Sequence, residues 1–139
     1  MEIGRNATML LCSNVEQSRK YLETALGLSP KTDLGWFVNF TSDDGDPPTF
    51  ELSLCACEHE SVPVSVRHPS DGVVLAFQVA DADAEQARFV ECGLPILAEV
   101  KTEPWGQRHF FAQAPDGVVL DIFALVPPDP EWMKAHGFA

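Results

Sequence analysis

The chain contains an internal repeat, which constrains its fold more than any other feature. The segment EQSRKYLE at Glu16–Glu23 recurs, with one residue dropped, as EQARFVE at Glu85–Glu91. Each copy then reaches a Gly-Leu pair, and each follows an apolar run that is typical of a strand. The copies lie about half a chain apart, so the sequence predicts one duplicated module and not a solenoid of many short repeats.

Both copies of the repeat have the start and stop signals of a helix. Polar side chains before each copy can accept hydrogen bonds from the free N–H groups of a first helical turn. Gly27 and Gly93 fit the left-handed residue that ends a helix, and Pro30 and Pro95 prevent its continuation. The candidate capping residues are Ser13 or Asn14 in the first copy and Asp81 or Asp83 in the second.

Strand-like runs surround both predicted helices, and their order predicts an α+β fold of two tandem βαβββ modules. We assign residues 1–58 to the first module, 59–70 to a linker, 71–126 to the second module, and 127–139 to a tail with a short helix around Trp132. The predicted strands are Thr8–Cys12, Trp36–Thr41 and Thr49–Cys55 in the first half, and Val73–Val79, Ile96–Lys101, Gln107–Gln113 and Val118–Leu125 in the second.

Composition and charge limit the classes of partner. Nine Lys+Arg against 21 Asp+Glu give a net charge of −12, which repels phosphate backbones and anionic lipid. We therefore expect no nucleic-acid or membrane role. The charge would attract cationic molecules, or it serves only solubility. No signal peptide or membrane-spanning run is evident, so a cytoplasmic location is expected, with the four cysteines as buried free thiols.

Two stretches of the sequence carry recognisable motifs. Met9–Leu28 combines a strand, a capped helix and a Leu-Gly-Leu turn. The run EPWGQRHFF at Glu103–Phe111 is followed by Pro-Asp-Gly and an acid-bearing strand. Together they resemble the vicinal oxygen chelate superfamily of glyoxalases, bleomycin-resistance proteins and dioxygenases, and the second stretch looks like the bleomycin-resistance branch. The resemblance implies a curved, incompletely closed mixed sheet around one cavity, and a homodimer in which the partner chain helps to build or close each cavity.

The resemblance also implies where a metal would bind. Enzymes of the superfamily hold a divalent metal with four side chains from the first and last strands of each module, and these positions fall on Ala7, Glu51, Val74 and Asp121. Alanine and valine cannot coordinate a metal, and two carboxylates alone would bind one weakly. We therefore expect no metal and no cofactor. Whether the protein is an enzyme stays open, with the missing histidines pointing against it.

Strand alternation predicts which side chains line the cavity. In Thr49–Cys55 the apolar residues should pack on the helix, which leaves Thr49, Glu51 and Ser53 in the cavity. Each site residue has a structural alternative. Glu51 and Asp121 could be acids with only a structural role, and His109 a hydrogen-bonded strand residue. The predicted ligand-binding residues are Trp36, Glu51, Gln78, Trp105, His109, Phe111 and Asp121.

The aromatic and remaining histidine residues have alternatives of the same kind. Trp105 could plug a loop, and Trp36 could belong to the core or to an interface. His59, His68 and His136 are expected to be exposed to solvent.

Three classes of function compete. The first is metal-independent binding of a small aromatic or cationic molecule, as in bleomycin-resistance-like sequestration, which aromatic faces and carboxylates favour. The second is a glyoxalase- or dioxygenase-type enzyme, with a degenerate metal site or with metal-free acid/base catalysis by His109 and a carboxylate. The third is an accessory module without a ligand. The sequence favours the first.

Overall fold

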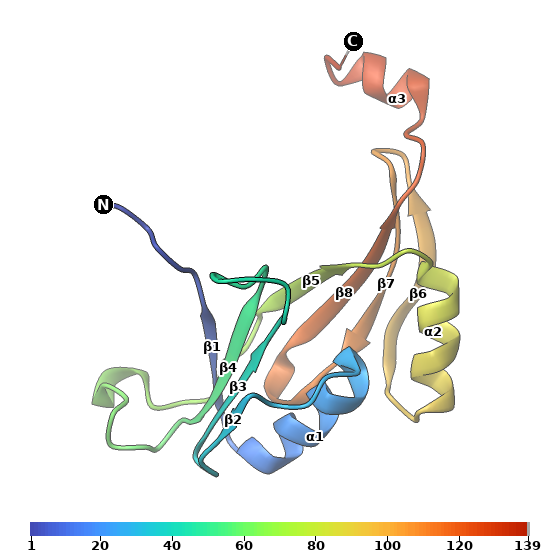
Figure 1. The fold of residues 1–139 in the computed structure, drawn as a ribbon. Coiled ribbons are helices and arrows are strands. Elements are labelled where there is room, and N and C mark those ends of the chain that lie inside the picture. The colour runs from blue at the N-terminus through green and yellow to red at the C-terminus, as the bar shows by residue number, and fades with distance from the viewer. Residues whose placement is uncertain (139) are drawn as a thin grey trace. The chain divides into compact units, whose positions relative to one another are not determined.

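The computed structural model describes residues 1–138, which form two compact modules, Met1–Asp71 and a second that begins at Gly72 (Figure 1). These are called the first and second module below. The first contains β1 (Thr8–Cys12), α1 (Val15–Leu26), β2 (Thr32–Asp33), β3 (Phe37–Thr41), β4 (Glu51–Ala56) and a 3-10 turn at Val64–Val66. The second contains β5 (Val74–Gln78), α2 (Ala82–Glu91), β6 (Ile96–Glu103), β7 (Gln107–Gln113), a 3-10 turn at Pro115–Gly117, β8 (Val119–Leu125) and α3 (Pro130–Ala135).

The two modules share one topology. Each holds a four-stranded mixed sheet, with strand order β1-β4-β3-β2 in the first and β5-β8-β7-β6 in the second. The first and last strands of each module pair in parallel, and the remaining neighbours are antiparallel. Neither sheet closes on itself. The predicted α+β fold of two tandem βαβββ modules is therefore confirmed.

The helix signals act as the sequence predicts. The side chain of Asn14 accepts a hydrogen bond from the Gln17 N–H at 3.0 Å, and the side chain of Asp81 accepts one from the Ala84 N–H at 3.0 Å. These two residues, rather than Ser13 and Asp83, cap the helices. Gly27 has a φ of 66° just after α1, a left-handed conformation that side chains disfavour.

Helices α1 and α2 each pack on one face of the sheet of their own module (Figure 1). Alternation along the strands turns apolar side chains toward the helix, where Phe40, Leu54, Phe110 and Leu120 are fully buried. Phe110 meets Phe89 of α2 edge to face, with ring centroids 5.2 Å apart. The opposite face, here called the helix-free face, carries the alternate residues Asn39, Glu51 and Ser53 in the first module, and His109, Phe111 and Asp121 in the second.

Three sequence predictions need correction. Thr49 lies outside β4 and its hydroxyl bonds to the Asp44 carboxylate, so it belongs to the β3–β4 turn and not to the strand. Cys92 is exposed because it follows the last turn of α2, whereas the other three cysteines are buried free thiols. His59 is half-buried because it stacks on Trp36. None of the helices in the described part of the chain has the length and apolar character that crossing a bilayer requires.

Candidate binding site

A polar cluster lies on the helix-free face of the second module. His109 on β7 stands between two carboxylates: Nδ1 is 2.8 Å from Oδ1 of Asp121 on β8, and Nε2 is 3.3 Å from Oε1 of Glu103 on β6. These side chains are 9%, 17% and 12% exposed, so water screens the cluster only partly. Lys101 also contacts Glu103, at 3.4 Å.

The strand register explains the His109–Asp121 pair. His109 lies opposite Phe123, and Phe111 lies opposite Asp121. His109 and Asp121 are therefore diagonal neighbours on one sheet face, within reach of each other's side chains. The Phe111 ring lies 4.9 Å from the His109 ring, so an aromatic surface adjoins the polar pair.

A second polar cluster lies on the helix-free face of the first module, around Glu51. Asn39 on β3 donates from Nδ2 to Oε1 of Glu51 at 3.2 Å and to Oγ of Ser53 at 3.0 Å. Arg5, in the segment before β1, donates from Nε to Oε2 of Glu51 at 2.6 Å. The Glu51 side chain is only 16% exposed, and both of its oxygens accept hydrogen bonds.

The two clusters share one geometry. Asn39 lies opposite Ser53, so Asn39 and Glu51 form the same diagonal on β3 and β4 that His109 and Asp121 form on β7 and β8. Each module thus orients one carboxylate with a polar side chain from the preceding strand. The internal repeat in the sequence extends to this arrangement.

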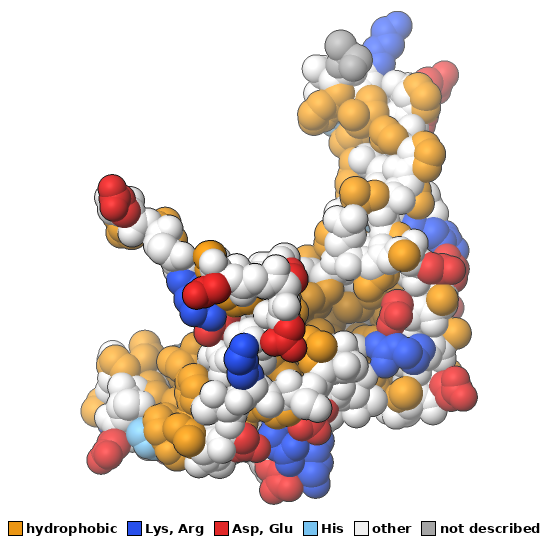
Figure 2. Space-filling model, in the orientation of Figure 1, with side chains coloured by type: hydrophobic (Ala, Val, Ile, Leu, Met, Phe, Trp, Pro, Cys, Tyr) orange, Lys and Arg blue, Asp and Glu red, His pale blue; other side chains and the backbone are white. Residues whose placement is uncertain are grey.

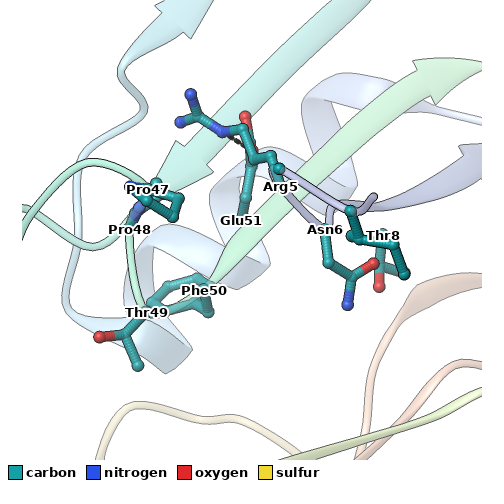
Figure 3. Close-up of a pocket in the computed structure, with 10 residues that line it drawn as sticks. Arg5, Asn6, Thr8, Pro47, Pro48, Thr49, Phe50 and Glu51 are labelled. Carbon is teal, nitrogen blue, oxygen red and sulfur yellow. Dashed lines mark hydrogen bonds and ion pairs between the residues drawn. The ribbon is translucent and has the colours of Figure 1, made fainter. Parts of the chain in front are cut away.

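A pocket of about 330 Å³ opens beside Glu51 in the first module (Figure 3). The segment before β1 forms one wall, and the end of the β3–β4 turn forms the other. Arg5 and Glu51 are its charged residues. The lining residues are Ile3, Gly4, Arg5, Asn6, Thr8, Pro47, Pro48, Thr49, Phe50 and Glu51.

A second hollow, of about 360 Å³, shares Arg5 and Pro48 with this pocket and is also lined by Lys31, Thr41, Ser42, Gly45 and Asp46. The β3–β4 turn that walls it is tied together at Asp44. Hydrogen bonds from Ser42 and Thr49 hold the pKa of Asp44 well below its usual range. This carboxylate therefore stays ionised and accepts the hydrogen bonds that hold the turn together.

The predicted aromatic and amide residues occupy separate places. Trp105, 46% exposed, donates from Nε1 to Oε1 of Gln107, and its ring lies 5.9 Å from that of Trp132. Trp36 stacks on His59 at 3.7 Å. Gln78 is exposed at the end of β5. The second module brings together His109, Phe111 and Asp121, and Glu51 lies in the other module.

The donor set does not fit the metal that the resemblance implies. On β5, Ala76 lies beside Asp121 and Val74 lies beside Val119, so hydrocarbon flanks this acid. Within each module, residues 1–138 offer no group of three His, Cys, Asp or Glu side chains placed to hold a metal ion. Beside Glu51 the neighbouring group is the positively charged guanidinium of Arg5, which cannot serve as a metal ligand.

The model of the glyoxalase-like domain matches residues 6–125, which span both modules and both clusters. The chain belongs to this family. Solved structures of glyoxalase-like proteins share the fold. A glyoxalase/bleomycin resistance protein/dioxygenase from Nocardioides has a TM-score of 0.69 and 22% identity, over 91% of this chain and 84% of that one. No curated protein matches the chain significantly.

Two further neighbours support the same fold. A glyoxalase-related enzyme from Fulvimarina pelagi has a TM-score of 0.70 at 19% identity, over 88% of each chain. A lactoylglutathione lyase from Agrobacterium tumefaciens has a TM-score of 0.66 at 18% identity, over 99% of this glyoxalase-like domain and 98% of that chain. At such identities the likeness shows the fold alone.

Sequence reasoning did not find Arg5, Asn39 or Glu103. Arg5 lies outside any periodic segment, and Asn39 and Glu103 carry no motif of their own. Alternation gave a usable signal for Asn39, because it shares a face with Glu51 once the β3–β4 register is known. Glu103 required knowing that β6 continues past Lys101.

Proposed function

We propose that this glyoxalase-like domain binds a small aromatic cation without a metal and sequesters it, as bleomycin-resistance proteins do. One observation carries the proposal: each module holds a half-buried carboxylate, Glu51 or Asp121, in a fixed orientation on its helix-free sheet face. A carboxylate that a neighbour already orients binds a cation with little further loss of conformational freedom.

The surroundings of the carboxylates support an aromatic ligand. Phe111 adjoins the Asp121 cluster, and Phe50 with two prolines walls the pocket beside Glu51. Such surfaces stack on planar groups, and aromatic faces attract cations. The net charge of −12 raises the local concentration of any cation. Three buried free thiols suit a reducing compartment, which supports the proposed cytoplasmic location.

Calorimetry with matched ligands tests the proposal. A planar cation such as benzamidine and a bleomycin-type compound are compared with the neutral isostere benzamide. Glu51→Gln and Asp121→Asn should each lower the binding free energy by about 1–3 kcal/mol, the range for a hydrogen bond to a charged group. Added salt should weaken binding. Glu58→Gln, which neutralises an exposed loop acid, is the matched control. Cations that bind no better than benzamide would contradict the proposal.

Trp105 gives a separate readout of the same screen. If its exposed ring stacks on the ligand, Trp105→Ala should weaken binding by an amount similar to the loss of a carboxylate. If Trp105 only closes the β6–β7 loop against Trp132, the affinity should stay unchanged while the fluorescence of the C-terminal segment changes.

Metal-free acid/base catalysis is the second candidate, because His109 and Asp121 form a 2.8 Å pair of the kind that orients a catalytic imidazole. The other ring nitrogen faces Glu103 at 3.3 Å, so no nitrogen of His109 is directed at a substrate unless Glu103 moves. The experiment is an assay for isomerisation of a glutathione hemithioacetal, the type of reaction that the name of the Agrobacterium neighbour suggests. Turnover that His109→Gln abolishes would favour the enzyme.

A further inference from the structure

Arg5 already makes the contact with Glu51 that a cationic ligand would make. Its guanidinium donates from Nε to Oε2 of Glu51 at 2.6 Å (Figure 3), and a second nitrogen lies 3.8 Å from Asp46. The Arg5 side chain is 50% exposed, whereas Glu51 is 16% exposed. The Glu51 carboxylate thus lies in a largely buried position on the sheet, and the Arg5 guanidinium contacts it from the solvent-exposed side.

The segment that carries Arg5 has little else to hold it. All residues from Met1 to Ala7 are exposed, and this segment precedes the first strand (Figure 1). The Arg5 side of the ion pair is half exposed, so solvent screens the attraction in part and the long arginine side chain loses conformational freedom when it pairs. A small cation at modest concentration can therefore compete with Arg5 for Glu51.

Thr41 supplies a second polar atom at the same place. Its hydroxyl is buried without a hydrogen-bond partner among the described residues, and the residue is only 9% exposed. In the β3–β4 register Thr41 lies directly opposite Glu51. A buried hydroxyl without a partner carries a free-energy cost that a ligand N–H group would relieve.

The two hollows of the first module meet at Arg5. Arg5 lines both the pocket beside Glu51 and the hollow that contains Thr41. When the Arg5 side chain swings away, the Glu51 carboxylate and the Thr41 hydroxyl face one common space. A carboxylate oxygen and a hydroxyl oxygen on adjacent strands can accept two N–H groups from one planar cation.

We propose that the first module contains a binding site for guanidinium or amidinium ligands, in which the ligand displaces Arg5, bonds to Glu51 and Thr41, and packs its apolar part on Pro47, Pro48 and Phe50. This inference rests on the proposed function, because it assigns the cationic ligand a chemical class and one of the two carboxylates. The further element is that Arg5 of the same chain competes with the ligand for the Glu51 carboxylate.

The experiment is a calorimetric titration of the full-length protein with benzamidine, with benzamide as the neutral comparison. Arg5→Ala should bind benzamidine about two- to fivefold more tightly than the unmodified chain, because the ligand no longer displaces the half-exposed Arg5 side chain from Glu51. Glu51→Gln should weaken binding at least about tenfold, and Thr41→Val about three- to tenfold.

Lys20→Ala is the matched control for Arg5→Ala. It removes the same charge from the same module, and Lys20 forms an ion pair with Glu16 on the surface of α1. It should leave the affinity unchanged. Thermal melts check that each variant folds, and Thr41→Val should melt no lower than the unmodified chain because its hydroxyl has no hydrogen-bond partner among residues 1–138.

A second readout does not depend on affinity differences. The Nε–H proton of Arg5 donates to Glu51 in the free protein, so its NMR signal should shift and its exchange with water should speed up when benzamidine binds. An unchanged Arg5 signal at saturation would overturn the inference.

The remaining outcomes separate this inference from the proposed function. If benzamidine binds but Arg5→Ala binds no more tightly, or Lys20→Ala improves binding equally, the displacement of Arg5 is wrong. If Glu51→Gln leaves the benzamidine affinity unchanged but Asp121→Asn abolishes binding, the proposed site in the first module does not exist and the proposed function stands. If no cation binds any variant, both are wrong.

Discussion

Glu51 and Asp121 are carboxylates whose surroundings limit what they can hold. Each is largely removed from water, so each needs hydrogen-bond donors to remain charged at low cost. Asn39 and His109 fill that role from the neighbouring strand. One oxygen of each acid is engaged in this way; the other oxygen of Glu51 accepts from Arg5, so a ligand must displace Arg5 to reach it.

The first prediction at this scale concerns metal content. Protein purified without a chelator should contain well below one divalent metal per chain, because Ala7 and Val74 occupy two of the four ligand positions that the resemblance implies and cannot coordinate a metal. Elemental analysis measures this directly. About one metal per chain, lost in both Glu51→Ala and Asp121→Ala, would contradict it.

The second prediction concerns Tyr21, whose hydroxyl is buried without a partner among the described residues. Burial disfavours the charged phenolate and raises the pKa of Tyr21 to about 12. Tyr21 is the single tyrosine of the chain, so the absorbance of tyrosinate during an alkaline titration reports on this residue alone. The midpoint should fall from about 12 to about 10 when the protein is unfolded in denaturant.

The raised pKa also predicts a loss of stability in alkali. The unfolded chain ionises Tyr21 near pH 10, whereas the folded chain holds the proton to about pH 12. The contribution to stability is therefore complete below pH 10 and is lost as the pH rises toward 12. Tyr21→Phe should remove this dependence without destabilising the protein at neutral pH, because the hydroxyl it deletes has no partner. Urea unfolding at a series of pH values would show it.

The start of each long helix depends on a capping side chain, and Asp81 at the start of α2 allows a direct test. Asp81→Ala should lower the free energy of unfolding by about 1 kcal/mol, since it removes the acceptor for the Ala84 N–H and a negative charge at the helix N-terminus. Asp71→Ala, in an exposed loop, is the control. Equal urea midpoints for the two variants would contradict the assignment of Asp81 as the cap.

Most of the elements could be predicted because their signals are local. Alternation and turn residues placed β1 and β7 at their observed ends, and cap residues fixed both long helices. The two-residue strand β2 was missed, because so short a strand has no periodicity of its own. Thr49 was misplaced because a local hydrogen bond to Asp44 competes with the ladder of β4.

The candidate site was less predictable because it depends on contacts that are distant in sequence. The positions of Glu51 and Asp121 on a helix-free face followed from strand alternation and from the family resemblance. The partners of these acids depend on the strand register and, for Glu51, on a residue that precedes β1 by several positions. No periodic pattern predicts that Arg5 should reach across to β4.

At the scale of the whole molecule, hydrophobic side chains reach the surface of both modules, as the face shown in Figure 2 illustrates. Met9 on β1 is 51% exposed, and Val74 on β5 is 55% exposed. Both strands pair on one side only within the described chain, so their backbone groups on the other side are open to another strand or to water.

We expect the protein to form a homodimer that covers these edges and side chains. Sedimentation at micromolar concentration should give twice the mass of the chain, and Val74→Lys should shift the equilibrium toward monomer because it places a charge on the covered surface. Lys20→Glu, on the surface of α1, should leave the dimer intact. A monomer at every concentration would disprove the expectation.

The diagonal shared by Asn39–Glu51 and His109–Asp121 bears on how such a chain changes over generations. Each carboxylate is oriented by a residue of its own module, so a substitution in one half leaves the geometry of the other half undisturbed. The two halves now differ at this position, with an amide at Asn39 and an imidazole at His109, while each keeps its acid. Substitutions in one module can therefore change the ligand that this module binds while the carboxylate of the other module, Glu51 or Asp121, stays in place.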